Sequence, residues 1–279
     1  MPEVVVPPSP TRGINAWLRA AHMGPTVAVT VLAGLLGVDW GLPTTTVVLL
    51  VAAVFAGQLT IGWGNDLVDA DRDRRVGRRD KPLALGVLDP RRVTSAVVLA
   101  LAASVALSGL LGWRSAVAHL GLVVASGHVY NLLLKGTAWS WLPYAVAFGS
   151  LPGVVTLAQS TPELPAPWMV AAGAMLGVGA HFLNALPDFG DDEATGVRGL
   201  PHRLGAAWSR RIAVILLVSA SVIVITAWWP HAAWWGVVPN AAFVVVLAAI
   251  ALRGKGDLPF QAAIIIAVLD VAMLGLAGS

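Results

Sequence analysis

The residues best suited to chemistry are two groups of acidic and amide side chains that share one spacing. Each group follows the pattern Asn-x3-Asp-x3-Asp, and the two groups begin 119 residues apart. Their members are Asn65, Asp69 and Asp73 in the first group and Asn184, Asp188 and Asp192 in the second. On an α-helix this spacing places three oxygen-bearing side chains on one face, one turn apart. Two such faces that point at each other would form an oxygen-lined cage for hard divalent cations.

The surroundings of both groups favour Mg²⁺ together with a diphosphate. Carboxylates packed this closely repel one another, and bound cations relieve the repulsion. Asparagine and carboxylate oxygens suit Mg²⁺ better than zinc or copper, and Mg²⁺ usually completes its coordination with substrate phosphates. Basic residues can bind the remaining phosphate oxygens. Such residues follow both groups: Arg78, Arg79 and Lys81 after the first, and Arg198, His202 and Arg203 after the second.

The composition indicates a protein that crosses the membrane several times. Hydrophobic residues make up 57% of the 279 residues and charged residues only 12%, about half the charged fraction of a soluble domain. The net charge of +3 is not a nucleic-acid signal, because basic residues concentrate beside membrane spans. The chain has no cysteine, which excludes disulfides and thiolate metal sites. Isoprenyl diphosphates fit such a protein because they join an anionic head to an apolar tail.

Nine apolar stretches are long enough to cross a bilayer, which requires about 20 residues. We predict spans at 14–38, 43–64, 92–112, 115–134, 138–158, 167–187, 207–229, 232–252 and 259–278. With the N-terminus in the cytoplasm, 17 of the 18 Lys and Arg residues fall on the cytoplasmic side, and only Arg114 does not. This orientation places both acidic groups on the cytoplasmic side. The Ala-, Val- and Gly-rich composition favours a bacterial cytoplasmic membrane.

The two acidic groups also indicate an internal repeat. The first follows the second predicted span and the second follows the sixth, so the repeat is parallel rather than inverted. We therefore predict a disordered tail at 1–13 and a single transmembrane domain at 14–279. Within this domain, 14–134 and 138–252 form the repeated halves and 259–278 forms the final helix.

With these motifs the chain resembles the UbiA superfamily of intramembrane prenyltransferases. The hallmarks of that family are an NDxxDxxxD motif and a second DxxxD motif, each after a span. The matching residues are Asn65, Asp66, Asp69 and Asp73 for the first motif and Asp188 and Asp192 for the second. The resemblance covers nearly the whole chain. It implies an all-α membrane protein with nine transmembrane helices in a UbiA-type bundle around a central cavity.

The resemblance and the neighbouring residues together assign roles to individual side chains. Two Mg²⁺ ions that bridge the diphosphate are expected on Asn65, Asp66, Asp69, Asp73, Asp188 and Asp192. The expected diphosphate contacts are Arg19, Arg78, Lys81, Tyr130, Lys135, Asn184 and Arg203. The predicted catalytic residues are Asp69, Asp188, Lys81 and Tyr130. The stretch after the first motif is one residue shorter than the family's RTxxRP pattern and has Lys81 in place of an arginine.

The implied activity is Mg²⁺-dependent transfer of an isoprenyl group from a prenyl diphosphate to a small, lipophilic or aromatic acceptor, through an allylic carbocation. A terpene cyclase of the same fold, which needs no acceptor, is the alternative. A transporter or lipid-binding protein would need polar residues along a path through the membrane midplane, and the sequence has few. Three residues keep open interpretations. Trp63 lines the prenyl channel or packs in the core, His22 contacts the head group or only packs, and Asp270 lies inside the final span without an evident partner.

Overall fold

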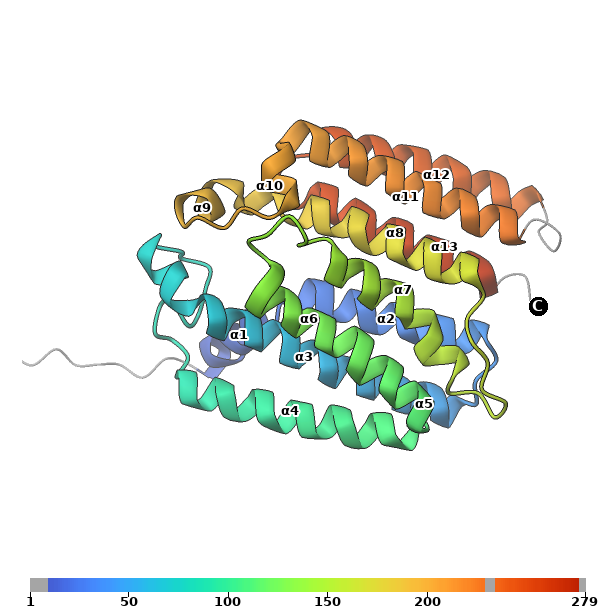
Figure 1. The fold of residues 1–279 in the computed structure, drawn as a ribbon, viewed down its shortest axis with the longest axis horizontal. Helices are drawn as coiled ribbons and strands as arrows, with labels where there is room; N and C mark the ends of the chain where they lie inside the picture. Colours follow the sequence, from blue (N-terminus) through green and yellow to red (C-terminus); the bar gives the residue numbers. More distant parts are fainter. Residues whose placement is uncertain (1–9, 229–233, 276–279) are drawn as a thin grey trace, which may run out of the picture.

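Every regular element in the part of the chain that the computed structural model describes, residues 10–228 and 234–275, is a helix. The elements are α1 (Pro10–Ala20), α2 (Met23–Asp39), α3 (Thr44–Arg75), α4 (Pro90–Leu110), α5 (Trp113–Ala116), η1 (Val117–Val124), α6 (Ala125–Val129), η2 (Tyr130–Leu134), α7 (Leu142–Thr156), α8 (Pro167–Asn184), η3 (Leu186–Asp188), α9 (Phe189–Ala194), α10 (Leu200–Leu204), α11 (Ala206–Trp228), α12 (Trp234–Arg253) and α13 (Leu258–Gly275). Figure 1 shows the long helices side by side, with α9 and α10 gathered at one end of the bundle.

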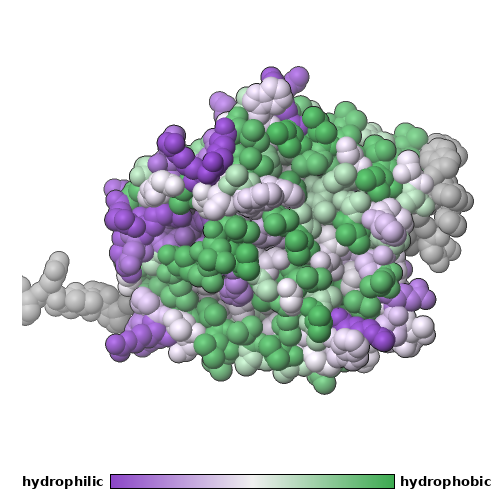
Figure 2. Space-filling view, in the orientation of Figure 1, coloured by the Kyte–Doolittle hydropathy of each residue, from purple (hydrophilic) through white to green (hydrophobic). Residues whose placement is uncertain are grey.

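The helices coincide in position with the nine predicted spans, but the number of spans stays a prediction. Within the described residues, five helices are long and apolar enough to cross a membrane, or six if the bent pair of α1 and α2 forms one span. Three further apolar helices are shorter. Figure 2 shows hydrophobic surface across the middle of the molecule and a hydrophilic patch at the end that carries α9.

The predicted domain boundaries are only partly covered by the described residues. Residues 1–9 of the predicted tail lie outside them, and α1 already begins at Pro10, before the predicted start at 14. Residues 229–233 and 276–279, at the ends of the predicted spans 207–229, 232–252 and 259–278, also lie outside them. The repeat of 14–134 and 138–252 stays a prediction.

The first predicted span is a bent pair of helices rather than one straight helix. α1 and α2 meet at 63°, and His22 between them has a φ of 50°. This left-handed conformation costs a residue with a Cβ about 1–2 kcal/mol. Gly62 of α3 faces the bend, because a Cβ at Gly62 would lie 2.3 Å from the carbonyl oxygen of Ala21. The absent side chain at Gly62 therefore lets the bend approach α3 and brings His22 toward the first acidic motif.

The helix that carries the first motif is longer than its predicted span at 43–64. α3 runs without interruption for 32 residues, roughly 48 Å, whereas the hydrocarbon core of a bilayer is about 30 Å thick. The motif therefore lies on a helix and not in a loop. The connection that follows contains Gly77 and Gly86, both with positive φ. α4 then begins at Pro90 with Asp89 as its N-cap, which accepts a hydrogen bond from the backbone N–H of Arg91 at 2.8 Å.

The predicted span at 115–134 contains two π-helical stretches, η1 and η2. Wide turns of this kind are rare and occur often at functional sites. η2 begins at Tyr130, and its last residue directly precedes Lys135. These wide turns set the directions in which Tyr130, Asn131 and Lys135 leave the helix.

The last helix closes the bundle against the N-terminal half. α13 packs against α2 as well as against α12 and α8. The main core accordingly joins residues from both ends of the chain, such as Leu32 and Ile266. Asp270 of α13 accepts a hydrogen bond from Ser221 Oγ of α11 at 2.8 Å, and both residues are buried. Asp270 thus has a partner within the bundle that the sequence did not reveal.

Candidate active site at the carboxylate end of the bundle

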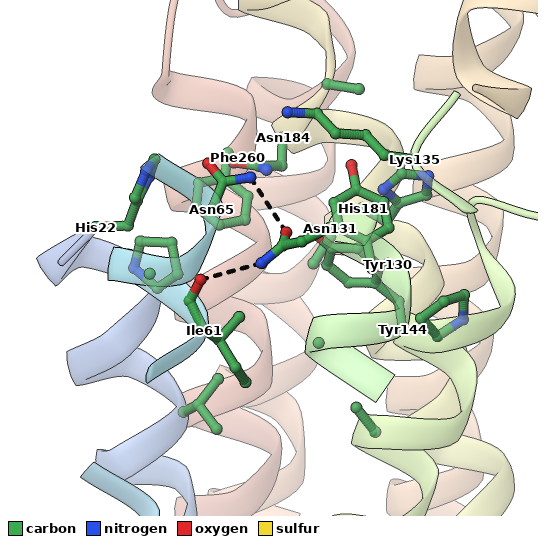
Figure 3. Close-up of a pocket in the computed structure, with 18 of the residues that line it drawn as sticks. His22, Ile61, Asn65, Tyr130, Asn131, Lys135, Tyr144, His181, Asn184 and Phe260 are labelled. Carbon is green, nitrogen blue, oxygen red and sulfur yellow. Dashed lines mark hydrogen bonds between the residues drawn. The ribbon is translucent and has the colours of Figure 1, made fainter. Parts of the chain in front are cut away.

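A cavity of about 260 Å³ lies inside the bundle, with acidic residues at one end and apolar walls beyond them. Its walls come from α2, α3, α7, α8 and α13, together with the π-helical segment before Lys135. The members of both acidic groups line it: Asn65, Asp69, Asp73, Asn184, Asp188 and Asp192. The structure therefore brings together two sequence motifs that lie more than a hundred residues apart. Figure 3 shows several of the lining residues.

The first motif presents one helical face to the cavity. Asn65, Asp69 and Asp73 follow one another at intervals of four residues on the continuous helix α3, so they lie on one side of it. Asp69 is 5% exposed and Asp73 is 3% exposed. Asn65 is fixed by a hydrogen bond from its Nδ2 to Asn131 Oδ1 at 3.1 Å, and Asn131 in turn donates to the carbonyl oxygen of Ile61 at 3.0 Å (Figure 3).

The structure does not place Asp66 with the predicted metal ligands. Asp66 lies one residue along the helix from Asn65, about 100° around the axis, and is not among the residues that line the cavity. Its Oδ1 instead accepts a hydrogen bond from Lys81 Nζ at 2.8 Å and lies 3.2 Å from His22 Nε2. Lys81 Nζ is also 3.0 Å from His22 Nε2. Asp66 thus contacts Lys81 and His22 without lining the cavity itself, and its assignment as a metal ligand stays a prediction.

The second motif does not lie on one helix, contrary to our expectation. α8 ends at Asn184, a short 3₁₀ turn carries Asp188, and α9 carries Asp192. The 3₁₀ turn contains Pro187, which removes one backbone hydrogen bond of the helix, although Pro167–Ala194 still forms one helical segment of 28 residues. Asp192 is 7% exposed, whereas the Asp188 side chain is 43% exposed. All three residues still line the cavity.

Basic side chains connect the two motifs across the end of the cavity. Lys135 Nζ donates to Asp69 Oδ2 at 2.5 Å. Arg72 Nη2 lies 2.9 Å from the same oxygen and 3.8 Å from Asp192 Oδ1. Arg72 is a site residue that the sequence reasoning missed, because it lies between two motif positions and resembled an ordinary residue at a helix end.

A second cationic link comes from the connection between α3 and α4. Arg78 Nη1 donates to Asp188 Oδ1 at 2.9 Å and lies 3.4 Å from Asp191 Oδ2. Its Nε and Nη2 donate to the two oxygens of Asp80 at 2.8 and 2.7 Å. These hydrogen bonds lower the pKa of Asp80 to about 2 and raise the pKa of Arg78 above its usual range. Arg78 therefore stays charged and oriented toward the second motif.

The chemistry of the acidic residues fits Mg²⁺, although their present partners are cations of the protein itself. Carboxylate and amide oxygens are the ligands that Mg²⁺ prefers. Among the described residues, no three His, Asp or Glu side chains already form a ready set of metal ligands. Lys135, Arg72 and Arg78 instead balance the charge of Asp69 and Asp188. Metal binding by these carboxylates therefore requires the three cations to shift.

A chain of aromatic side chains lines part of the cavity wall. The Tyr130 and Tyr144 rings meet edge to face with centroids 5.1 Å apart. Tyr144 also stacks on His181, with centroids 4.5 Å apart, and on Phe148 at 6.4 Å. His181 Nε2 lies 3.1 Å from Ser140 Oγ. Of these aromatic residues, only Tyr130 was expected from the sequence.

Three residues with predicted or open roles lie away from the cavity. Arg19 and Arg203 are exposed and are not among the described residues that line it, and their role as diphosphate contacts stays a prediction. Trp63 packs against Trp17, with ring centroids 5.5 Å apart, in a small cluster beside α1. Of its two interpretations, packing in the core is confirmed. His22, by contrast, does line the cavity.

Comparison with known protein sequences identifies one family. A family model described as the UbiA prenyltransferase family matches residues 23–270. The bacteriochlorophyll synthase 33 kDa chain of Cereibacter sphaeroides is 29% identical over 192 residues, which span 64% of this chain and 62% of that relative. The digeranylgeranylglyceryl phosphate synthase of Methanopyrus kandleri is 25% identical over 218 residues, which span 75% of this chain and 77% of that relative.

Solved structures of UbiA homologues share the fold. The homologue from Archaeoglobus fulgidus, bound to DMAPP and Mg²⁺, matches with a TM-score of 0.70 and 19% identity over 94% of this chain and 98% of its own. The apo homologue from Aeropyrum pernix matches with a TM-score of 0.74 and 20% identity over 92% of this chain and 98% of its own. At these identities the likeness establishes the fold.

Proposed function

Because the chain belongs to the UbiA prenyltransferase family, we propose that it transfers an isoprenyl group from a prenyl diphosphate to a small, lipophilic or aromatic acceptor within the membrane. The observation that carries this proposal is a cavity with two facing carboxylate motifs at one end and apolar walls at the other. This polarity matches a ligand with an anionic head and a hydrocarbon tail. The Archaeoglobus homologue, which binds DMAPP and Mg²⁺, supports the same ligand class.

Five residues are proposed to hold two Mg²⁺ ions at the acidic end: Asn65, Asp69, Asp73, Asp188 and Asp192. Bound Mg²⁺ would supply positive charge that stabilises the departing diphosphate. Asp66 is left out of this set because, unlike the other five predicted ligands, it does not line the cavity.

Three cations of the chain are proposed to bind the diphosphate oxygens that the carboxylates cannot approach. Lys81, Arg78 and Lys135 all line the cavity near its acidic end. Each donates charge-assisted hydrogen bonds, which are roughly twice as strong as those between neutral groups. Their charge favours cleavage of the bond between C1 of the prenyl group and the diphosphate oxygen, because the electron pair of that bond leaves with the diphosphate. Asp66 and His22 hold Lys81 in place for this role.

The remaining walls are proposed to protect the allylic cation until the acceptor attacks. Leu32, Leu151 and Leu176 line the cavity together with the aromatic side chains, so water finds few polar partners there. The faces of Tyr130 and Tyr144 carry π-electron density that attracts a cation. A nucleophilic atom of the acceptor then forms a bond to C1, and the acceptor loses a proton.

The membrane orientation is proposed from charge. The acidic end of the cavity coincides with the hydrophilic patch in Figure 2, near α9 and the connection that carries Arg78. Because basic residues concentrate on the cytoplasmic side, we place this end and the N-terminus in the cytoplasm of a bacterial cell.

The proposal is tested with the purified protein in nanodiscs, supplied with geranyl, farnesyl or geranylgeranyl diphosphate and a panel of phenolic acceptors, with Mg²⁺ or with EDTA. We expect release of pyrophosphate and a prenylated acceptor in Mg²⁺ and neither in EDTA. A cyclic hydrocarbon formed without acceptor would identify a terpene cyclase instead. Absence of Mg²⁺-dependent binding and turnover with every diphosphate would refute the proposal.

A matched pair of variants controls this experiment. Asp69→Asn removes a carboxylate that is 5% exposed and lines the cavity, and we expect activity to be lost. Asp71→Asn removes a carboxylate two residues away, whose side chain is 87% exposed and pairs only with Arg74 among the described residues. We expect the Asp71→Asn variant to keep full activity.

A further inference from the structure

A second, smaller cavity lies beyond the apolar end of the first. It has a volume of about 60 Å³ and is lined by residues of α2, α7, α8, α11 and α13. Among its described lining residues, Asp270 is the one that can carry a charge, and its Oδ2 is already engaged by Ser221. Leu36, Met169 and Val224 are buried residues that line this second cavity and not the first. The second cavity is therefore an interior apolar space, suited to hydrocarbon.

The two cavities share one wall. Five residues line both: Leu32, Phe148, Leu151, Leu176 and Ala267. Phe148 has the largest side chain of the five, and it is half-buried whereas the other four are buried. Of the five shared residues, Phe148 therefore offers the most side-chain bulk between the two spaces.

The Phe148 side chain is held in place by its neighbours. A Cβ at Gly177 of α8 would lie 2.7 Å from the Cβ and Cγ of Phe148, and a Cβ at Gly173 would lie 2.5 Å from its carbonyl oxygen. The two glycines thus form a recess in α8 that receives this residue of α7. The ring also lies nearly parallel to that of Tyr144, with the planes at 7° and the centroids 6.4 Å apart. These neighbours restrict the positions that the Phe148 side chain can adopt.

From this geometry we propose that Phe148 ends the prenyl-binding site and so sets the longest prenyl chain that the protein accepts. This inference rests on the proposed function. A diphosphate held at the acidic end directs its tail along the apolar walls toward Phe148. A chain that fills the first cavity stops at the ring, and a chain longer by one isoprene unit needs the space of the second cavity. Removal of the ring joins the two spaces.

The test measures binding rather than turnover, so that it does not depend on the acceptor. Non-hydrolysable thiolodiphosphate analogues of dimethylallyl, geranyl, farnesyl and geranylgeranyl diphosphate are titrated with Mg²⁺ against the protein in nanodiscs. For the wild type, we expect affinity to increase with chain length up to one analogue and then to stop increasing. For Phe148→Ala, we expect the next longer analogue to bind about tenfold tighter than it binds wild type, the effect of burying roughly two more methylene groups.

Further variants locate the gained space. Ala172 lines only the second cavity, so Ala172→Leu partly fills it. In the double variant, we expect Ala172→Leu to abolish the tighter binding of the longer analogue that Phe148→Ala produces. On its own, we expect Ala172→Leu to leave the wild-type length profile, which is the dependence of affinity on prenyl chain length, unchanged. Phe243→Ala is the matched control, since Phe243 is 58% exposed on α12 and lines neither cavity. If Phe148→Ala does not fold, Phe148→Leu is expected to shift the profile in the same direction by a smaller factor.

The outcomes distinguish failure of the proposed function from failure of the role of Phe148. If wild type binds no analogue in a Mg²⁺-dependent way, the proposed function fails. If wild type binds the series but the folded Phe148 variants keep its length profile, the proposed function stands and the role of Phe148 is refuted. An equal shift in Phe243→Ala would also refute it, because the effect would then not be specific to Phe148.

Discussion

Replacement of Asp66 by asparagine distinguishes a metal ligand from a residue that positions a lysine. The side chain of Asp66 is 1% exposed and that of Lys81 is 13% exposed. Lys81 Nζ lies 2.8 Å from Asp66 Oδ1. Removal of one partner from a buried ion pair costs about 3–5 kcal/mol when the other charge is left alone. Asparagine keeps an oxygen that can accept from Lys81, so we expect Asp66→Asn to lower the free energy of unfolding by about 2 kcal/mol.

Asp69→Asn is the matched comparison within the same helix. Asp69 is also nearly buried and also paired, with Lys135 and Arg72, so we expect a similar loss of stability. The two variants should differ in their response to Mg²⁺. In Asp69→Asn we expect the Mg²⁺ concentration for half-maximal binding of a thiolodiphosphate analogue to increase about a hundredfold or more, since a ligand is lost. In Asp66→Asn we expect this concentration to stay unchanged while the analogue binds about tenfold more weakly, because Lys81 loses its anchor.

Titration of Mg²⁺ at fixed analogue, followed by titration of the analogue at saturating Mg²⁺, separates these effects. The free energy of unfolding of each variant is measured in mixed micelles, by increasing the fraction of a denaturing detergent. An Asp66→Asn variant whose Mg²⁺ requirement increases as much as that of Asp69→Asn would refute our reasoning and restore Asp66 as a metal ligand.

Three further predictions concern stability in the same unfolding assay. Gly62→Ala should lower stability by about 1–3 kcal/mol, since its Cβ would meet the backbone at the bend between α1 and α2, whereas Gly121→Ala, with nothing within 4 Å, should have no such cost. Ser221→Ala should cost about 0.6–1.7 kcal/mol, because Asp270 loses its donor, and no change would show that this hydrogen bond does not stabilise the bundle. Asp80→Asn should destabilise equally at pH 6 and pH 8. The pKa of Asp80 is lowered to about 2, so its ion pair contributes fully above the unfolded value of 3.8 and is lost only as the pH falls toward 2.

The sequence was a good guide to the first motif because its geometry is local. The four-residue spacing of Asn65, Asp69 and Asp73 needs only an uninterrupted helix, and α3 provides one. The same reasoning failed for the second motif. Pro187 lies between Asn184 and Asp188, and a proline there should have indicated a break in the helix.

Other parts of the site depend on contacts that no local pattern encodes. Asp66 was grouped with the metal ligands by its place in the motif. In the structure it accepts a hydrogen bond from Lys81, which lies 15 positions later in the chain. Asn131 reaches Asn65 through a π-helical turn, which apolar periodicity does not distinguish from an ordinary helix. The position of Phe148 depends on two glycines of another helix. Long-range packing of this kind becomes visible only when the helices are assembled.

The break at Pro187 gives the two halves of the site different mechanical characters. One set of carboxylates is mounted on a rod that continues into the membrane, so its spacing is fixed by the helix itself. The other set is distributed over a helix end, a single 3₁₀ turn and the short α9. Fewer backbone hydrogen bonds connect such short pieces, so we expect them to be displaced more easily than α3. The site therefore has one rigid side, on α3, and one side that can adjust. We expect adaptation to a different ligand or ion to begin in residues 185–199, with α3 unchanged.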